Sequence, residues 1–254
     1  MTREERQLRE AIITKCRWMN ASGLNQGTSG NISARYKDRM LISPSATPYD
    51  AMKPEMIAAM PLEGEYGSWE GPLQPSTEWR FHLDIMRGRP DVGGVVHTHS
   101  TYATVLAIAH KPIPACHYMM AAFGGNDIRC AGYARYGTAE LSELALQALE
   151  GRNGCLLANH GMIAVGANLD KAMWLAVELE TIARQYYLSL ALGAPHILGE
   201  AEIADTAKGF STYGLQAPKA KPKSDAKSNP KPAKARAAKA AARQLVEKKR
   251  SGKR

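Results

Sequence analysis

Two histidines one residue apart end an apolar stretch of the sequence, and a third histidine ends another. His97 and His99 close the run 92–99, and His160 follows the run 155–158. In an extended chain, residues i and i+2 point to the same face, so the first two imidazoles converge on one point. Three neutral imidazoles around one position form an open zinc site with room for a substrate oxygen. The spacing therefore predicts metal-assisted chemistry on an oxygen-rich small molecule.

Glu78 stands where a helix is expected to begin, with the residue in the first turn. Its carboxylate is either a partner of the helix dipole or a group near the metal, as resting-state ligand or general base. Spacing alone does not choose between these roles. The other histidines do not share the pattern above, and we expect structural or surface roles for all of them: His82, His110, His117 and His196.

Glycine, serine, threonine and asparagine gather in three short stretches, 27–31, 43–45 and 76–77. Turns and helix starts of this kind bind phosphate through backbone N–H groups and hydroxyls, without a cationic side chain. The Walker pattern is absent, because no Gly-Lys-Ser/Thr follows the glycines. Such loops are often only turns, so these residues alone leave phosphate binding open.

Charge divides the 254 residues into two parts. Residues 216–254 hold 14 Lys and Arg against 2 Asp and Glu, a net charge of +12. The whole chain carries +9, so residues 1–215 carry −3. With 44% hydrophobic residues overall, the chain is long enough for one substantial core. We therefore predict a mildly acidic globular domain over 1–215 and a basic tail over 216–254.

The basic tail, residues 216–254, consists mainly of Lys, Ala and Pro. It has too few large apolar residues to offset the entropy of ordering, which predicts disorder. A solubilising extension and weak polyanion or nucleic-acid binding are both compatible with its charge, and such binding would be strongly salt-dependent. Membrane attachment is disfavoured, because the basic run lacks an apolar anchoring face.

Four cysteines are widely separated and form no C-x-x-C pair: Cys16, Cys116, Cys130 and Cys155. They are typical of reduced thiols in a cytosolic protein. No N-terminal stretch has the apolar run of a signal peptide, and no run approaches the ~20 residues that span a bilayer. We therefore expect a cytoplasmic protein.

Helical and strand-like patterns alternate along the first 192 residues. Apolar spacing and capping residues predict helices at 4–22, 76–87, 100–109, 138–150 and 170–192. Short apolar runs predict strands at 32–36, 39–43, 92–99, 155–158 and 162–165. The alternation favours an α/β or α+β layered domain with a central sheet. The short connection 159–161 favours a partly antiparallel sheet.

An ordered set of motifs resembles the class II aldolase family over about residues 5–215. The spacing is collinear, and the match does not include the basic tail. In chain order the motifs are Gly-Leu-Asn-Gln-Gly-Thr-Ser-Gly-Asn at 23–31, Ser-Thr-Glu-Trp-Arg-Phe-His at 76–82, His-Thr-His-Ser at 97–100, His-Tyr-Met at 117–119, Ala-Ala-Phe-Gly-Gly-Asn at 121–126, Tyr-Gly-Thr at 136–138 and Asn-His-Gly at 159–161.

The resemblance implies a three-layer α/β fold in which a central, largely antiparallel sheet is flanked by helices. It also implies one Zn²⁺ per subunit, held by His97, His99 and His160. Glu78 would be the catalytic acid/base and would also approach the metal in the empty site. These assignments come from the family's pattern, carried onto matching positions of this chain.

Two tyrosines and a phosphate site are implied in the same way. Tyr118 would be the second proton-transfer group, at the leaving aldehyde oxygen. Tyr213 matches the family's late tyrosine, which reaches the active site of a neighbouring subunit in a homotetramer. The substrate phosphate would be held by Gly30, Asn31, Ser45, Ser76 and Thr77.

The chemistry that the resemblance implies is retro-aldol cleavage of a ketose 1-phosphate to dihydroxyacetone phosphate and an aldehyde. The resemblance is greatest to family members that cleave L-fuculose 1-phosphate. Other members of the family cleave 5-deoxy- or 5-methylthioribulose 1-phosphate. Four positions depart from the pattern: Ser45-Ala46 replaces Thr-Gly, Thr77 replaces a serine, and Tyr136 replaces another aromatic residue near the aldehyde end. These departures are compatible with phosphate binding and leave the aldehyde half undetermined.

Two alternatives remain beside an aldolase. L-ribulose-5-phosphate 4-epimerases share the zinc histidines, but they carry an aspartate where this chain has Cys-His-Tyr-Met-Met at 116–120. The second alternative is a non-catalytic scaffold, because adducin heads resemble this fold and adducins end in basic tails. Adducin heads, however, lack the metal histidines. The aldolase is therefore the favoured interpretation.

Overall fold

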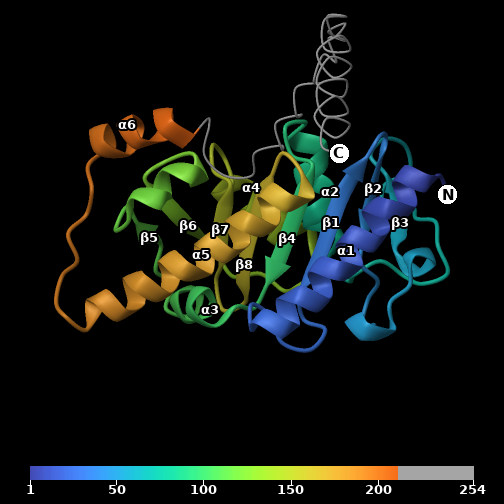
Figure 1. The fold of residues 1–254 in the computed structure, drawn as a ribbon, viewed down its shortest axis with the longest axis horizontal. Helices are drawn as coiled ribbons and strands as arrows, with labels where there is room; N and C mark the ends of the chain where they lie inside the picture. Colours follow the sequence, from blue (N-terminus) through green and yellow to red (C-terminus); the bar gives the residue numbers. More distant parts are fainter. Residues whose placement is uncertain (211–254) are drawn as a thin grey trace, which may run out of the picture. The chain divides into compact units, whose positions relative to one another are not determined.

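The computed structural model describes residues 1–210 (Figure 1). Three predictions fall outside these residues: the domain boundary at 215/216, the disordered basic tail and the role of Tyr213. Within residues 1–210, none of the helices combines the length and the apolar character that crossing a bilayer requires.

An eight-stranded sheet forms the centre of the described part of the chain. In space its order is β3-β2-β1-β4-β8-β7-β6-β5, and only β6 and β7 pair in parallel. The prediction of a largely antiparallel central sheet is therefore confirmed. The strands are β1 (Asn31–Tyr36), β2 (Arg39–Ile42), β3 (Ala58–Pro61), β4 (Gly94–Thr98), β5 (Ile113–Pro114), β6 (Asp127–Ala131), β7 (Gly154–Leu157) and β8 (Gly161–Gly166).

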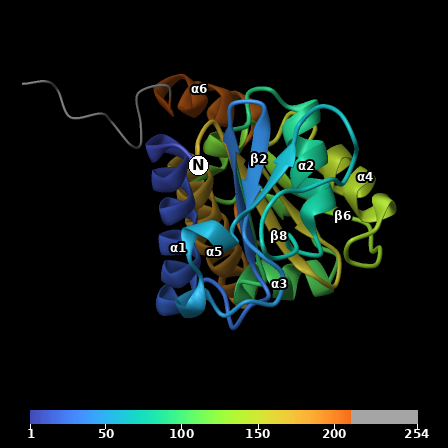
Figure 2. The same ribbon diagram turned by 90° about the vertical axis from the view of Figure 1, so that its right-hand side faces the viewer.

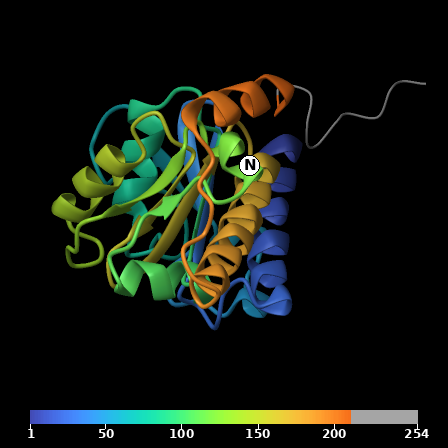
Figure 3. The same ribbon diagram turned by 90° about the vertical axis from the view of Figure 1, so that its left-hand side faces the viewer.

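Helices cover both faces of the sheet, α1 and α5 on one face and α2 and α4 on the other, as the two side views show (Figure 2, Figure 3). The predicted three-layer arrangement is confirmed by this placement. The α-helices are α1 (Arg3–Ser22), α2 (Trp79–Gly88), α3 (Thr101–Ile108), α4 (Ala139–Ala148), α5 (Leu169–Leu190) and α6 (Glu200–Phe210). Three 3₁₀ helices are η1 (Tyr49–Ala51), η2 (Pro54–Met56) and η3 (Tyr118–Phe123).

Each face of the sheet has its own hydrophobic core, because side chains alternate along a strand. On β4, Val96 lies in the cluster that includes Leu179 of α5, while Val95 lies in the cluster that includes Phe81 of α2. All four side chains are at most 1% exposed. Burying a side chain of this size stabilises the fold by about 1.5–3 kcal/mol. The central strands are thus packed against helices on both faces, which fixes the position of their ends.

The ends of the helices follow from local chemistry. The Thr2 hydroxyl accepts a hydrogen bond from the Glu5 N–H at 3.2 Å and caps α1, which ends at Gly23 in the left-handed conformation (φ 77°). The Thr138 hydroxyl caps α4 by accepting from the Leu141 N–H at 3.3 Å. The start predicted at Thr138 is therefore present as a hydrogen bond, and so is a cap at Thr2 that was not predicted.

Most predicted element ends agree with the structure to within two residues. One prediction was wrong: α2 begins at Trp79, so Glu78 precedes the helix and does not lie in its first turn. The Ser76 hydroxyl accepts from the Glu78 N–H at 3.3 Å, which closes a turn before the helix. Three strands and one α-helix were not predicted, namely β3, β5, β6 and α6, and neither were the three 3₁₀ helices.

Candidate metal centre and active-site cavity

Sheet register brings the three histidines together. His97 lies on β4, His99 follows that strand by one residue, and His160 immediately precedes β8. In the antiparallel pair of β4 and β8, Thr98 is opposite Met162, so the end of one strand meets the start of the other. The three histidines, far apart in the sequence, therefore lie together at the end of two central strands.

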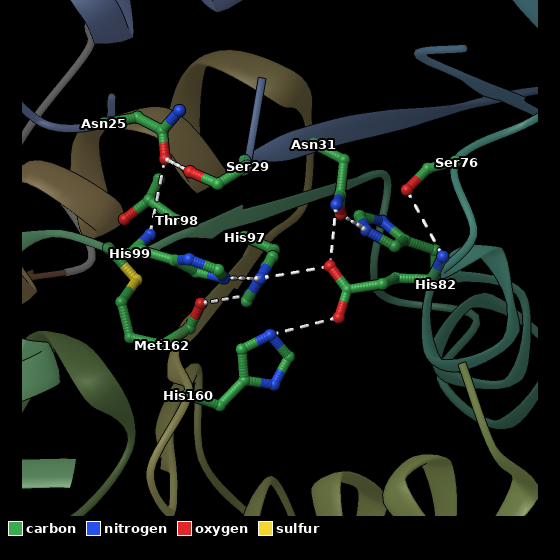
Figure 4. Close-up of polar contacts among 12 residues, drawn as sticks. Asn25, Ser29, Asn31, Ser76, His82, His97, Thr98, His99, His160 and Met162 are labelled. Carbon is green, nitrogen blue, oxygen red and sulfur yellow. Dashed lines mark hydrogen bonds and ion pairs between the residues drawn. The ribbon is translucent and has the colours of Figure 1, made fainter. Parts of the chain in front are cut away.

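The ring nitrogens of these histidines converge on one point (Figure 4). One nitrogen from each ring lies within 4.8 Å of the others, and the Nε2 atoms of His97 and His99 are 3.1 Å apart. Glu78 faces the same point, with Oε2 at 3.2 Å from Nε2 of His97 and Oε1 at 3.1 Å from Nε2 of His160. The structure thus brings together all four side chains predicted to bind the metal.

The surroundings of His97 show which of its two ring nitrogens carries no hydrogen. Nδ1 lies 2.9 Å from the carbonyl oxygen of Met162, which can only accept, so Nδ1 carries the proton. In the neutral ring, Nε2 then directs a lone pair toward Nε2 of His99 and the Glu78 carboxylate. Oε1 of Glu78 is buried and accepts no hydrogen bond from the described residues, despite its short distance to His160. Lone pairs that converge without a donor fit a divalent cation, and zinc accepts this set of nitrogen and oxygen ligands.

Burial and charge set the protonation of the cluster. Burial would raise the pKa of the Glu78 carboxyl, but the electrostatic influence of the neighbouring His97 and His160 rings outweighs burial and lowers it. Burial and the positive charge of His97 and His160 lower the pKa of His99 to about 4. Near pH 7, Glu78 is therefore a carboxylate and His99 a neutral imidazole, which are the forms that bind metal ions.

The loop that carries His160 has a constrained backbone. Asn159 has a φ of 55°, in the left-handed region that asparagine tolerates better than most residues. A Cβ atom on Gly161 would lie 2.5 Å from the carbonyl oxygen of Thr98 and 2.9 Å from the ring of His99. Only glycine allows this approach between the strands, so packing beside the metal ligands explains the glycine of the Asn-His-Gly motif.

A cavity of about 490 Å³ opens beside the histidine cluster. His99, His160 and Glu78 lie in its wall. All five residues predicted to bind phosphate also line it: Gly30, Asn31, Ser45, Ser76 and Thr77. The predicted metal centre and the predicted phosphate site therefore belong to one cavity.

The polar wall of the cavity lies just before the first turn of α2. Among the described residues that line the cavity, none is a lysine or an arginine. The backbone N–H groups of Ser45 and Ser76 already donate to other carbonyl groups, at 3.0 Å each. An anion here would therefore be held by hydroxyls, by other backbone N–H groups and by the positive end of the helix.

Tyrosines occupy two different positions relative to the cavity. Tyr133 and Tyr136, between β6 and α4, line it and are 63% and 62% exposed. Tyr133 was not singled out in the sequence, because it belongs to no spacing pattern, and the wall residue Asn159 was noted only as part of the Asn-His-Gly motif. Tyr118 does not line the cavity; it lies on η3, where its ring stacks on Phe210 of α6 with 6.4 Å between centroids.

The other histidines do not join the cluster, as expected, although two of them support it. His82 is completely buried and hydrogen-bonded to Asn31 at 2.6 Å. Nε2 of His110 lies 2.6 Å from Oδ1 of Asn159, beside the ligand loop. His117 caps η3 by accepting from the Met119 N–H at 3.3 Å, and His196 is exposed. The sequence analysis had no signal for the contacts of His82 and His110, because they depend on tertiary packing.

Relatives of this chain are known from sequence. It is 51% identical over 207 residues to a 5-methylthioribulose-1-phosphate/5-deoxyribulose-1-phosphate aldolase of Rhodospirillum rubrum, a match that covers 82% of this chain and 92% of that protein. It is 46% identical over 214 residues to the L-fuculose phosphate aldolase of Escherichia coli strain K12, which covers 84% of this chain and 98% of that protein.

A solved structure and a family model agree with these relatives. The structure of an L-fuculose 1-phosphate aldolase matches with a TM-score of 0.77 and 38% identity, covering 81% of this chain and 96% of that one. The model of the Class II Aldolase and Adducin N-terminal domain matches residues 10–187, well over half of the sequence. The shared fold and these matches, with the three-histidine cluster beside the cavity, show that the chain belongs to the class II aldolase family.

Proposed function

We propose that this protein is a metal-dependent aldolase that cleaves a ketose 1-phosphate to dihydroxyacetone phosphate and an aldehyde. The observation that carries the proposal is the presence of the histidine cluster, Glu78 and a hydroxyl-rich wall in one cavity. The phosphate of such a substrate needs a binding wall, and its reacting carbons need stabilisation of developing charge. The aldolase names of the relatives support the same reaction.

Zn²⁺ is the proposed resident ion, one per subunit, held by His97, His99 and His160 with Glu78 as a further ligand before substrate binds. A divalent ion bound there supplies Lewis-acid stabilisation of the negative charge that develops as the carbon–carbon bond breaks. The Nδ1–H of His97 donates to the Met162 carbonyl and so fixes the orientation of that ring.

Glu78 is the proposed proton carrier. Its two oxygens differ, because Oε2 accepts the Asn31 Nδ2–H at 2.9 Å while Oε1 accepts no hydrogen bond from the described residues. Oε1 is therefore the oxygen that can take a proton or deliver it to a substrate carbon in the cavity. The low pKa of this carboxyl keeps it ionised at neutral pH in the resting protein.

The hydroxyl-rich wall is proposed to hold the substrate phosphate through Gly30, Asn31, Ser45, Ser76 and Thr77. Its contribution is positioning, because an anchored phosphate fixes where the carbon chain meets the cluster. A wall without lysine or arginine among the described lining residues still suits a dianion, since the start of α2 adds a positive potential.

Tyr118 is proposed as the second proton-transfer group, at the aldehyde oxygen. Since it does not line the cavity of its own chain, this role requires that a neighbouring subunit supply it. A homotetramer with active sites between subunits meets that requirement, and the Tyr118 ring is 48% exposed, as such a contact needs. Tyr213 is proposed to reach a neighbouring site in the same way.

The relatives suggest two kinds of substrate with a common phosphate half. L-fuculose 1-phosphate and the 5-deoxy- or 5-methylthioribulose 1-phosphates all yield dihydroxyacetone phosphate and differ in the aldehyde released. We place the reaction in the cytoplasm. The basic tail is proposed to be a solubilising extension with weak, salt-dependent affinity for polyanions.

Release of dihydroxyacetone phosphate from a panel of these ketose 1-phosphates tests the proposal directly. The Zn²⁺-loaded protein should cleave at least one of them, dialysis against a chelator should abolish cleavage, and added Zn²⁺ should restore it. Interconversion of L-ribulose 5-phosphate and D-xylulose 5-phosphate is assayed in parallel to detect an epimerase. No cleavage of any compound by the metal-loaded full chain would refute the proposal.

A further inference from the structure

A line of buried hydrogen bonds runs from the middle of β1 to the histidine cluster. Ser33 Oγ lies 2.7 Å from Nδ1 of His82, and Nε2 of the same ring lies 2.6 Å from Oδ1 of Asn31. Nδ2 of Asn31 then donates to Oε2 of Glu78 at 2.9 Å. Figure 4 shows the step from His82 to Asn31 beside the cluster. All four residues are at most 5% exposed, so water competes little for these bonds.

The direction of every bond in this line is determined by its last member. The carboxylate of Glu78 can only accept, so the amide group of Asn31 that faces it must be the NH₂. The Asn31 oxygen therefore faces His82, whose Nε2 must carry a hydrogen. Burial, reinforced by the charge of His97, lowers the pKa of His82 to about 3, so the ring is neutral and Nδ1 is bare. Ser33 then donates its hydroxyl hydrogen to Nδ1.

We propose that His82 is a positioning residue that, through Asn31, holds the Glu78 carboxylate in its working orientation. The inference rests on the proposed function of Glu78 as proton carrier. The Nε2–H of His82 makes one orientation of the Asn31 amide favourable, the orientation in which NH₂ points to the carboxylate. With the amide reversed, an oxygen would face Oε2, and the carboxylate would lose its hydrogen bond from Asn31.

This arrangement also gives the two carboxylate oxygens of Glu78 different roles. Oε2 is tied to Asn31, whereas Oε1, turned toward His160, accepts no hydrogen bond from the described residues. Holding one oxygen leaves the other free to move a proton without letting the carboxylate rotate. Asn31 was predicted as a phosphate ligand, but both ends of its amide are already engaged in the line. Its side chain therefore acts first on Glu78.

Two substitutions at one position separate a positioning role from simple filling of space. His82→Gln keeps an amide N–H where Nε2–H stands and can still donate to Asn31. His82→Asn is too short to do so, although it retains a polar group near the position of Nδ1. We expect His82→Asn to lower kcat by about 10- to 100-fold with KM changed less than about threefold, and His82→Gln to recover most of kcat.

A spectroscopic measurement accompanies the kinetics. Wild type and both variants are loaded with Co²⁺ alone, and the visible absorption of the bound ion reports the geometry of its ligands. The spectrum should change in His82→Asn and resemble that of wild type in His82→Gln. Thermal unfolding checks that all three proteins are folded. If His82→Asn does not fold, Ser33→Ala replaces it, with an expected fall in kcat of about threefold and a smaller change of the same Co²⁺ bands.

The outcomes distinguish this inference from the proposed function. If wild type cleaves a ketose 1-phosphate and the two His82 variants have equal kcat and equal Co²⁺ spectra, whether both normal or both impaired, the positioning role is wrong. If wild type cleaves no ketose 1-phosphate, the proposed function fails, and the Co²⁺ spectra alone decide whether His82 controls the Glu78 orientation.

Discussion

The two ends of the active-site cavity are built in opposite ways. At the inner end, His97 is completely buried and Glu78 is 5% exposed; His97 donates to the Met162 carbonyl of β8, and Glu78 accepts from Asn31 of β1. At the outer end, Tyr133 and Tyr136 are more than 60% exposed and lie on the connection between β6 and α4. The predicted metal ligand and proton carrier are therefore held by packing, whereas these two tyrosines lie on a surface segment.

This difference indicates how the fold can keep one reaction and change its substrate. A side chain at the end of a central strand cannot move without disturbing two hydrophobic cores, because the strand is packed on both faces. A tyrosine on an exposed connection can be replaced at little cost to stability. Mutations at the inner end should therefore affect the reaction itself, and mutations at the outer end the choice of substrate.

The strongest test of this contrast is removal of a metal ligand. His160→Ala should reduce kcat/KM by about a thousandfold or more, because the charge of the breaking bond loses its stabilisation. Zn²⁺ content measured after gel filtration should fall in parallel. His196→Ala, at an exposed histidine outside the cavity, serves as the control and should retain both metal and activity. A metal-free His160→Ala protein with normal turnover would contradict the role of the cluster.

Replacement of the proton carrier should have the next largest effect. Glu78→Gln keeps the size of the side chain and the position facing Asn31 but removes the charge and the proton acceptor. We expect kcat to fall by about 10²- to 10⁴-fold. Proton exchange at the reacting carbon of dihydroxyacetone phosphate, followed by NMR in D₂O, should fall by a similar factor. Rapid exchange in Glu78→Gln would assign the proton transfer to another group.

The sequence was sufficient to predict the inner end because its signals are local. The i, i+2 spacing of His97 and His99 places both rings on one face of a strand. The pairing of β4 with β8, which brings His160 to the other two, is a tertiary contact that no local spacing predicts.

Other parts of the site and fold had no local signal. The contact of His82 with Asn31 joins α2 to β1, and neither residue belongs to a spacing that indicates it. Tyr133 lies in a connection without periodicity. β5 has two residues, and α6 follows a turn-rich stretch in which no clear helix start was recognised. Contacts that arise from packing of distant elements, and elements too short to show a period, were therefore missed.

Burial of His82 near the inner end should also make the stability of the fold decrease at acidic pH. The pKa of His82 is lowered to about 3 by burial and by the charge of His97, while an unfolded histidine titrates near 6.5. Between these values the unfolded chain binds more protons, so stability is complete above about pH 6.5 and is lost as the pH falls toward 3. Urea unfolding of metal-free protein at pH 7 and pH 5 should show this loss in wild type and a smaller one in His82→Gln. His196→Gln should behave as wild type, since that ring is exposed.

The smallest effect is expected at the outer end, where it bears most directly on the contrast. Tyr136→Phe removes one hydroxyl from the cavity wall and should leave the melting temperature unchanged, because the side chain is 62% exposed. The ratio of kcat/KM for L-fuculose 1-phosphate to that for 5-methylthioribulose 1-phosphate should shift by up to about tenfold. This is the low end of the about 10- to 200-fold discrimination that one contact supplies, because the side chain is largely exposed. Tyr187→Phe, at a tyrosine that does not line the cavity, provides the control. If both variants leave the ratio unchanged, the exposed tyrosine does not select the aldehyde, and the selection must reside among the buried groups or in a neighbouring subunit.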